Sequence, residues 1–225
     1  MKNGIIVSCQ AEEGSAFNNV NSIVAFAKEA ERGGAVGVRI EGYENIKAVR
    51  AAINIPIIGI VKGKFTSGNV WITPTVQEAV LIEQSGADFI AADATGRKDP
   101  LHTKDGWQYL REICIGTNIP VIGDMAHSGF VHSSIIEAEK CGCKYLSTTL
   151  SGYTGYSDPT DGPDFEFLKI LLKVSNLPII AEGRYSKKDH IQIAKKLGVK
   201  NIVIGSSITR PHLITQKYKE SYDEL

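Results

Sequence analysis

A repeated aliphatic phrase constrains the fold of this chain more than any other feature. The three copies are INIPIIGIVK at 53–62, TNIPVIGDMA at 117–126 and SNLPIIAEGR at 175–184. Each copy opens with Asn and Pro and runs through aliphatic residues to a charged one. Because Pro ends a helix and biases the residue before it toward extended geometry, each copy predicts a turn from a helix into a buried strand.

A second kind of turn alternates with the first. In four segments a helical pattern closes on Gly and resumes as a strand, and we expect left-handed helix ends there, at Gly34, Gly86, Gly142 and Gly198. With one opening strand, the two kinds of turn predict eight strands. They span roughly residues 4–10, 37–41, 56–61, 89–93, 120–124, 145–149, 178–182 and 201–205.

The stretches between these strands have apolar residues at helical spacing, and Thr73–Pro74 is typical of an N-cap followed by Pro at the first helical position. Nearly continuous aliphatic strands that alternate with helices indicate a parallel sheet buried on both faces. Eight such units predict an α/β protein with the (β/α)8 TIM-barrel fold. A doubly wound open sheet is the alternative, but it would not need eight evenly repeated units. We expect residues 1–225 to form one barrel domain.

Composition argues against several classes of partner. The formal net charge is zero and no basic run is present, so we expect no nucleic-acid binding. The apolar runs are too short for a membrane span or a signal peptide, so we expect no membrane partner and a cytoplasmic location. The four cysteines are expected to be reduced thiols. Cys141 and Cys143 lack metal-site spacing, which favours a helix end with small residues over a metal site.

Ionisable residues finish several of the predicted strands. In a (β/α)8 barrel the carboxyl ends of the strands face one pocket, so Lys62, Asp124 and Glu182 should converge there. A layer-filling polar residue or a neutralised ion pair is the alternative for any one such residue. For the whole set it is a poor explanation, because burying so many charges without a ligand is costly. Three more polar residues are expected at the carboxyl ends of the strands, at the same height in the barrel, namely Gln10, Arg39 and Asp93.

The loops after the last two predicted strands suggest an anion site. Gly183 and Gly205 would let the backbone approach closely, and Ser206 and the adjacent Ser207 offer hydroxyl and N–H groups at a helix start. A Gly-Ser turn alone is most often only a turn, but its place after the last strand favours phosphate binding. Two cations could add charge-assisted bonds, Arg184 and Arg210.

The long loop at 152–164 is rich in Gly, Pro and Asp. We expect it to close over the pocket as a lid, and an exposed connection is the alternative. Tyr153, nearest the strand end, is the loop residue expected to touch a ligand. His127 is interpreted as a loop or helix-start histidine rather than a catalytic one.

Six short motifs, in chain order and at the strand ends, carry a family resemblance. IVSCQA, GIVK, ADAT, TTLSGYT, AEGR and ITRP resemble the N-acetylmannosamine-6-phosphate 2-epimerase family from about Ile5 to about Ile214. The resemblance implies a homodimeric enzyme of sialic acid catabolism, free of metal and cofactor, that interconverts N-acetylmannosamine 6-phosphate and N-acetylglucosamine 6-phosphate. It places catalytic roles on Lys62 and Glu182. It places substrate contacts on Gln10, Arg39, Asp124 and Arg210.

The residue types suit that chemistry. In the open-chain aldehyde the C1 carbonyl acidifies the C2 proton, so inversion needs an acid/base group with a near-neutral pKa and a group that steadies the developing oxyanion. A lysine among cations in an apolar barrel can have its pKa lowered from about 10.4 toward about 7–8. Lys62 therefore suits proton transfer, while Glu182 is either its acid/base partner or an orienting group during ring opening.

Two rival functions remain open on the sequence. A strand-end lysine also serves Schiff-base aldolases, so cleavage of a phosphorylated keto-sugar through an imine on Lys62 is the enzymatic alternative. A barrel that only binds a sugar phosphate is the alternative of another class. Such a sensor would have no reason to keep both Lys62 and Glu182.

Overall fold

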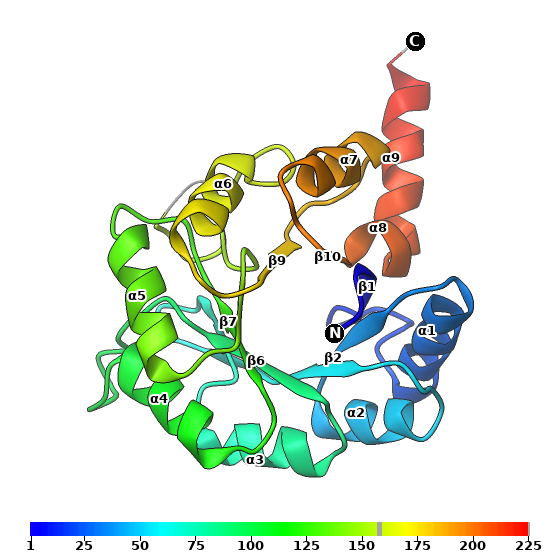
Figure 1. Ribbon diagram of the computed structural model, residues 1–225. Coiled ribbons are helices and arrows are strands. Elements are labelled where there is room, and N and C mark those ends of the chain that lie inside the picture. The colour runs from blue at the N-terminus through cyan, green and yellow to red at the C-terminus, as the bar shows by residue number, and fades with distance from the viewer. Residues whose placement is uncertain (157–158, 225) are drawn as a thin grey trace.

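The computed structural model describes residues 1–156 and 159–224, and its centre is a closed parallel barrel (Figure 1). The strand order around the barrel is β1-β10-β9-β8-β7-β6-β3-β2, with β1 hydrogen-bonded to both β2 and β10. The strands are β1 (Gly4–Cys9), β2 (Gly37–Glu41), β3 (Ile57–Ile60), β6 (Phe89–Asp93), β7 (Val121–Asp124), β8 (Tyr145–Ser147), β9 (Ile179–Glu182) and β10 (Asn201–Ile204). The predicted (β/α)8 TIM barrel is confirmed, and the open-sheet alternative is wrong because the sheet closes.

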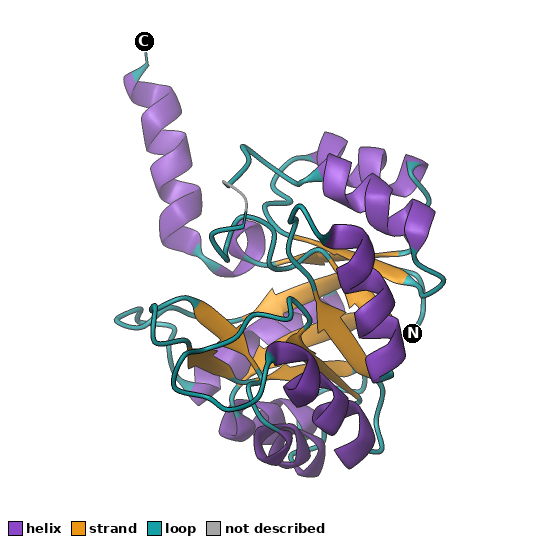
Figure 2. Cartoon of the chain, turned by 90° about the vertical axis from the view of Figure 1, so that its left-hand side faces the viewer, coloured by secondary structure: helices purple, strands orange, loops and turns teal. Residues whose placement is uncertain are grey.

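Helices surround this barrel in alternation with the strands (Figures 1 and 2). They are α1 (Val20–Arg32), α2 (Tyr43–Arg50), α3 (Val76–Gln84), α4 (Gly106–Gly116), α5 (Val131–Cys141), α6 (Phe165–Val174), α7 (Lys188–Lys196), α8 (Ser206–Thr209) and α9 (Pro211–Asp223). The last helix, α9, runs away from the barrel and has no buried residue. In the part of the chain that the structure describes, no helix combines the length and apolar character needed to cross a bilayer.

Two apolar layers hold the barrel together. One layer fills the barrel interior with side chains such as Ile6, Ile58 and Ile180, and the other lies between the sheet and the helices. The fit between β3 and α3 is close, since a Cβ at Gly59 would lie 2.3 Å from the Ile82 side chain. Glycine at this position lets the helix approach the strand.

The glycine-type helix ends are confirmed. The backbone φ angles of Gly34, Gly86, Gly142 and Gly198 lie between 86° and 109°, in the left-handed region. Gly142 directly caps α5, whose last residue is Cys141, as the helix-end interpretation of that segment predicts.

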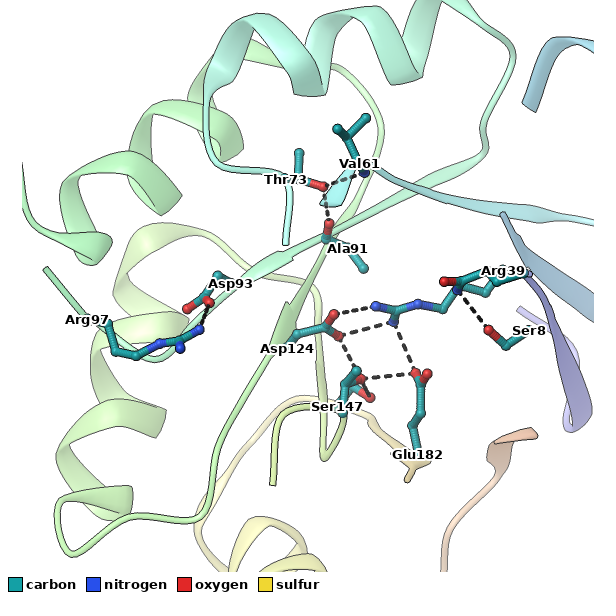
Figure 3. A network of polar contacts seen from close by, with 12 residues as sticks. Ser8, Arg39, Val61, Thr73, Ala91, Asp93, Arg97, Asp124, Ser147 and Glu182 are labelled. Atoms are coloured by element: carbon teal, nitrogen blue, oxygen red, sulfur yellow. Dashed lines mark hydrogen bonds and ion pairs between the residues drawn. The ribbon is translucent and has the colours of Figure 1, made fainter. Parts of the chain in front are cut away.

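The predicted start of α3 is wrong by two residues. The N-cap is Thr75, whose side chain accepts from the Glu78 N–H while the Glu78 carboxylate accepts from the Thr75 N–H. This reciprocal capping box satisfies two backbone N–H groups, so the helix begins after Thr75 and not after Thr73. Thr73 instead has a φ of 47° and donates its hydroxyl to the Ala91 carbonyl at 2.7 Å (Figure 3).

An antiparallel hairpin follows β3 and was not predicted. Its strands are β4 (Lys62–Lys64) and β5 (Val70–Ile72), with Lys62 opposite Ile72. Gly68, at a φ of 83°, forms its turn and donates to the Phe65 carbonyl at 2.8 Å. The turn signal Ser67–Gly68 between two short extended runs could have revealed this hairpin. The hairpin, rather than the barrel strand itself, therefore carries Lys62.

Candidate active site

A cavity of about 340 Å³ opens at the carboxyl ends of the barrel strands. The structure brings ten of the predicted site residues to its lining, and another of them, Asp124, is buried. The ten are Gln10, Arg39, Lys62, Tyr153, Glu182, Gly183, Arg184, Gly205, Ser206 and Arg210. Residues far apart in sequence converge here because every parallel strand ends at the same side of the barrel.

A buried ion cluster adjoins this cavity, and Figure 3 shows its contacts. Arg39 from β2 donates Nη2 to Asp124 Oδ2 at 2.5 Å, and its Nη1 to Asp124 Oδ1 at 3.2 Å and to Glu182 Oε2 at 3.0 Å. The side chains are 3%, 0% and 15% exposed, respectively. Burial alone would lower the pKa of Arg39, but the charges of Asp124 and Glu182 outweigh it and raise that pKa. The guanidinium therefore stays charged at the centre of the site.

Glu182 ends β9 in surroundings that favour its protonated form. Burial raises the pKa of its carboxyl, and the charge of Asp124 adds to that rise. Arg39, Lys62 and a hydrogen bond from Thr149 oppose the shift without cancelling it. A carboxyl whose pKa lies above its ordinary value is suited to exchange a proton near neutral pH.

Lys62 stands at the other side of the cavity, at the start of β4. Its side chain is exposed by area, but the cavity walls reduce its hydration and lower the pKa of its amine. The charges of Arg39 and Arg210 lower this pKa further, while Glu41 and Glu182 oppose the shift. The amine and the Glu182 carboxyl thus have pKa values displaced toward each other, the pattern of an acid/base pair.

Sequence reasoning missed the hydroxyl groups that follow β8. Thr149 Oγ1 donates to Asp124 Oδ1 at 2.9 Å or to Glu182 Oε2 at 3.0 Å, and it lies 2.8 Å from Ser147 Oγ. Thr148 Oγ1 donates to the Glu182 carbonyl at 2.7 Å and accepts from the Glu182 N–H at 2.9 Å. Both threonines belong to the TTLSGYT motif, which signalled this region but not the individual roles.

Arg184 follows β9 with its guanidinium on the loop at 152–164. It donates to the Gly162 carbonyl at 3.1 Å and to the Ser151 carbonyl at 2.9 Å, and its Cζ lies 5.1 Å from the centre of the Tyr153 ring. Its own φ is 59°, in the left-handed region. Of the predicted lid, positions 157 and 158 lie outside the described residues. Closure of this loop stays a prediction.

The predicted anion site lies at the start of α8. Gly205 is the N-cap and Ser206 the first helical residue, and a Cβ at Gly205 would lie 3.3 Å from Ser8 Cβ. The hydroxyl of Ser207 donates to the Tyr185 carbonyl at 3.2 Å, so it belongs to the scaffold. Arg210 pairs with Glu12 at the rim.

Two further polar residues lie outside the cavity lining. Asp93 pairs in register with Asp124 on the neighbouring strand. Its carboxylate is bound by Arg97 at 2.5 Å and does not line the cavity. The prediction that Asp93 faces the pocket is therefore wrong. His127 Nδ1 lies 2.8 Å from Asp164 Oδ2, and its ring stacks on Phe167 at 5.1 Å. Within residues 1–156 and 159–224, no cluster of three or more His, Cys, Asp or Glu side chains could hold a metal ion.

The closed barrel and the charged cavity at its carboxyl end define the class of protein, a (β/α)8-barrel enzyme. A family model described as "NanE: Putative N-acetylmannosamine-6-phosphate epimerase" matches residues 23–224. The chain belongs to this family of N-acetylmannosamine-6-phosphate 2-epimerases. It is accordingly an isomerase.

Individual relatives agree with the family model. A protein of Caldanaerobacter subterraneus is 41% identical over 97% of this chain and 90% of its own length, and one of Clostridioides difficile is 36% identical over 99% and 97%. Both are named "Putative N-acetylmannosamine-6-phosphate 2-epimerase". A solved structure of the N-acetylmannosamine-6-phosphate 2-epimerase from Clostridium perfringens has a TM-score of 0.86 at 33% identity, covering 97% of this chain and 92% of that one. These similarities favour neither the aldolase nor the silent sugar-phosphate binder.

Proposed function

We propose that this protein interconverts N-acetylmannosamine 6-phosphate and N-acetylglucosamine 6-phosphate by moving the proton at C2, with Lys62 and Glu182 as its acid/base residues. Family membership supports the reaction. One observation carries the two roles: the Lys62 amine and the Glu182 carboxyl line one cavity, with pKa values displaced toward each other. Amino sugar and sialic acid catabolism is the metabolic setting in which the family acts.

The reaction begins on the open-chain sugar, whose C1 carbonyl acidifies the C2 proton. One member of the pair removes this proton and leaves an enediolate, and the opposite face of C2 then receives a proton from the other member. The Arg39 guanidinium, fixed by Asp124 and Glu182, supplies a positive charge near the developing oxyanion. Because the cluster is already ordered, little reorganisation is needed when the charge develops.

Phosphate binding would hold the non-reacting end of the sugar. We assign it to the loops after β9 and β10, through Gly183, Arg184, Gly205 and Ser206. The sugar itself would contact Gln10, Tyr153 and Arg210. Arg184 would have to share its guanidinium between the loop carbonyls and the phosphate, because its hydrogen bonds to Gly162 and Ser151 are already made.

Three further proposals concern the whole molecule. Residues 1–225 would act as one catalytic domain. The protein would work in the cytoplasm as a homodimer. The exposed helix α9, which carries Tyr218 and Tyr222 on its surface, supports an assembly of two chains because its apolar groups have little cover within one chain.

A coupled assay tests the proposed reaction. Chelator-treated protein should convert N-acetylmannosamine 6-phosphate to the gluco isomer without added metal or nucleotide. Unphosphorylated N-acetylmannosamine should react with much lower kcat/KM, because phosphate binding energy positions C2. Absence of the gluco isomer would count against the reaction, and equal kcat/KM for both sugars would count against the phosphate site alone.

A further inference from the structure

The Thr149 hydroxyl occupies a position between the two carboxylates of the ion cluster. Its oxygen is 2.9 Å from Asp124 Oδ1 and 3.0 Å from Glu182 Oε2, two nearly equal distances. An ionised carboxylate only accepts hydrogen bonds, and a hydroxyl has a single hydrogen to donate. Thr149 can therefore serve only one of the two carboxylates at a time.

Ser147, the last residue of β8, completes this arrangement. Its hydroxyl is buried and lies 2.8 Å from Thr149 Oγ1. When Thr149 donates to a carboxylate, its lone pairs remain free to accept from Ser147. The Thr149 oxygen can then keep its place while its hydrogen changes direction between Asp124 and Glu182.

We propose that Thr149 is a positioning residue whose hydrogen bond passes from Asp124 to Glu182 when Glu182 loses its proton, and returns to Asp124 when Glu182 regains it. The inference rests on the proposed acid/base role of Glu182. An ionised Glu182 receives the bond, which stabilises the charged form. A protonated Glu182 needs no donor, and Asp124 then receives it. The hydroxyl thereby holds and stabilises the ionised Glu182 carboxylate, and it satisfies Asp124 when Glu182 is protonated.

The other groups around Glu182 explain why the Thr149 hydroxyl affects its charge state. Three strands and one loop place charged or polar groups near its carboxyl: Arg39 on β2, Lys62 on β4, Asp124 on β7 and Thr149 in the loop after β8. Arg39 is shared with Asp124, and Asp124 repels the charge on Glu182. Thr149 is the neutral donor that can adjust, and a hydrogen bond to a charged group contributes more than one between neutral groups.

Three substitutions at Thr149 test the proposal. Thr149→Val keeps the shape and removes the hydroxyl, Thr149→Ala removes it without steric risk, and Thr149→Ser restores it. We expect kcat to fall roughly tenfold to hundredfold in the Val and Ala variants, the value of a lost hydrogen bond to a charged group. The acidic limb of the kcat/KM profile should move to higher pH, since Glu182 loses a donor that lowers its pKa. The Ser variant should recover most of the lost kcat and most of the shift of the acidic limb.

A matched control separates positioning from general loss of a hydroxyl. Thr117→Val removes the bond from Thr117 Oγ1 to the Ile113 carbonyl at the end of α4, and its pH profile should not move. An unshifted acidic limb in both hydroxyl-free variants, or a Ser variant as impaired as the Val variant, would overturn the proposal. Failure of the reaction itself is distinguishable, because the unsubstituted protein would then form no epimer.

Discussion

Replacing Asp124 by Asn tests the ion cluster on which the proposed site depends. The substitution keeps volume and shape and removes one charge from a side chain that is 0% exposed. Asp124 accepts from Arg39 at 2.5 Å and 3.2 Å and from Thr149 at 2.9 Å. The change therefore acts on one buried set of charges and leaves the barrel packing in place.

The expected loss of stability depends on the ion pair that Arg39 keeps with Glu182. Breaking a buried ion pair typically costs about 3–5 kcal/mol, because a charge is left unpaired in the interior. In Asp124→Asn, Arg39 still has Glu182 at 3.0 Å, so we expect the lower end, about 3 kcal/mol. For a chain of this length that corresponds to a fall in Tm of roughly 6–12 °C.

The assay is urea unfolding followed by circular dichroism, with the pH profile measured on the same variant. The midpoint should fall with an unchanged slope, because the surface exposed on unfolding is the same. The matched control is Glu166→Gln, which breaks the exposed 2.7 Å pair with Lys169 and should change stability by less than about 0.5 kcal/mol.

The pH profile of Asp124→Asn independently tests the direction in which the pKa of Glu182 shifts. Burial and then Asp124 raise the pKa of Glu182, so removing the Asp124 charge should lower that pKa and move the acidic limb to lower pH. A loss of stability no larger than in Glu166→Gln would refute the buried-cluster reasoning. An acidic limb that moves upward would refute the electrostatic part of it.

The remaining predictions concern chemistry and packing. Lys62→Met should lower kcat by at least about a hundredfold, and an active variant would mean that another group carries the proton. The unsubstituted enzyme in deuterium oxide should place deuterium at C2, and borohydride should trap no adduct on it. A reduced imine on Lys62 of the unsubstituted enzyme would instead favour an aldolase. The plot of kcat/KM against pH should be bell-shaped. Its acidic limb, set by Glu182, should lie above the ordinary glutamate pKa, and its basic limb, set by Lys62, should lie below the ordinary lysine pKa. Two limbs at the ordinary pKa values would contradict the pairing. Gly59→Ala should cost about 1–3 kcal/mol in urea unfolding, because the new Cβ would lie 2.3 Å from Ile82, and no loss would mean that α3 can move away.

The arrangement of strands could be predicted from the sequence because its signals are local. Pro in the three aliphatic phrases and Gly at the other helix ends act within a few residues, through φ restriction and left-handed freedom. Each predicted strand differs from the observed one by at most two residues at either end. The rule that parallel strands share one active end then gave the membership of the cavity, including Lys62 and Glu182, without any knowledge of distances.

The tertiary structure alone decided how those residues meet. Arg39 contacts Asp124 and Glu182 across 85 and 143 positions of sequence, and Thr149 reaches the same two carboxylates. Lys62 lies on a hairpin, and Asp93 is held by Arg97 although its place on the strand matches that of Asp124. Local patterns determine which residues reach the end of the barrel, since backbone preferences act over a few bonds. Which side chain pairs with which, and how far each pKa shifts, depends on burial and charge in three dimensions, which no short stretch of sequence contains.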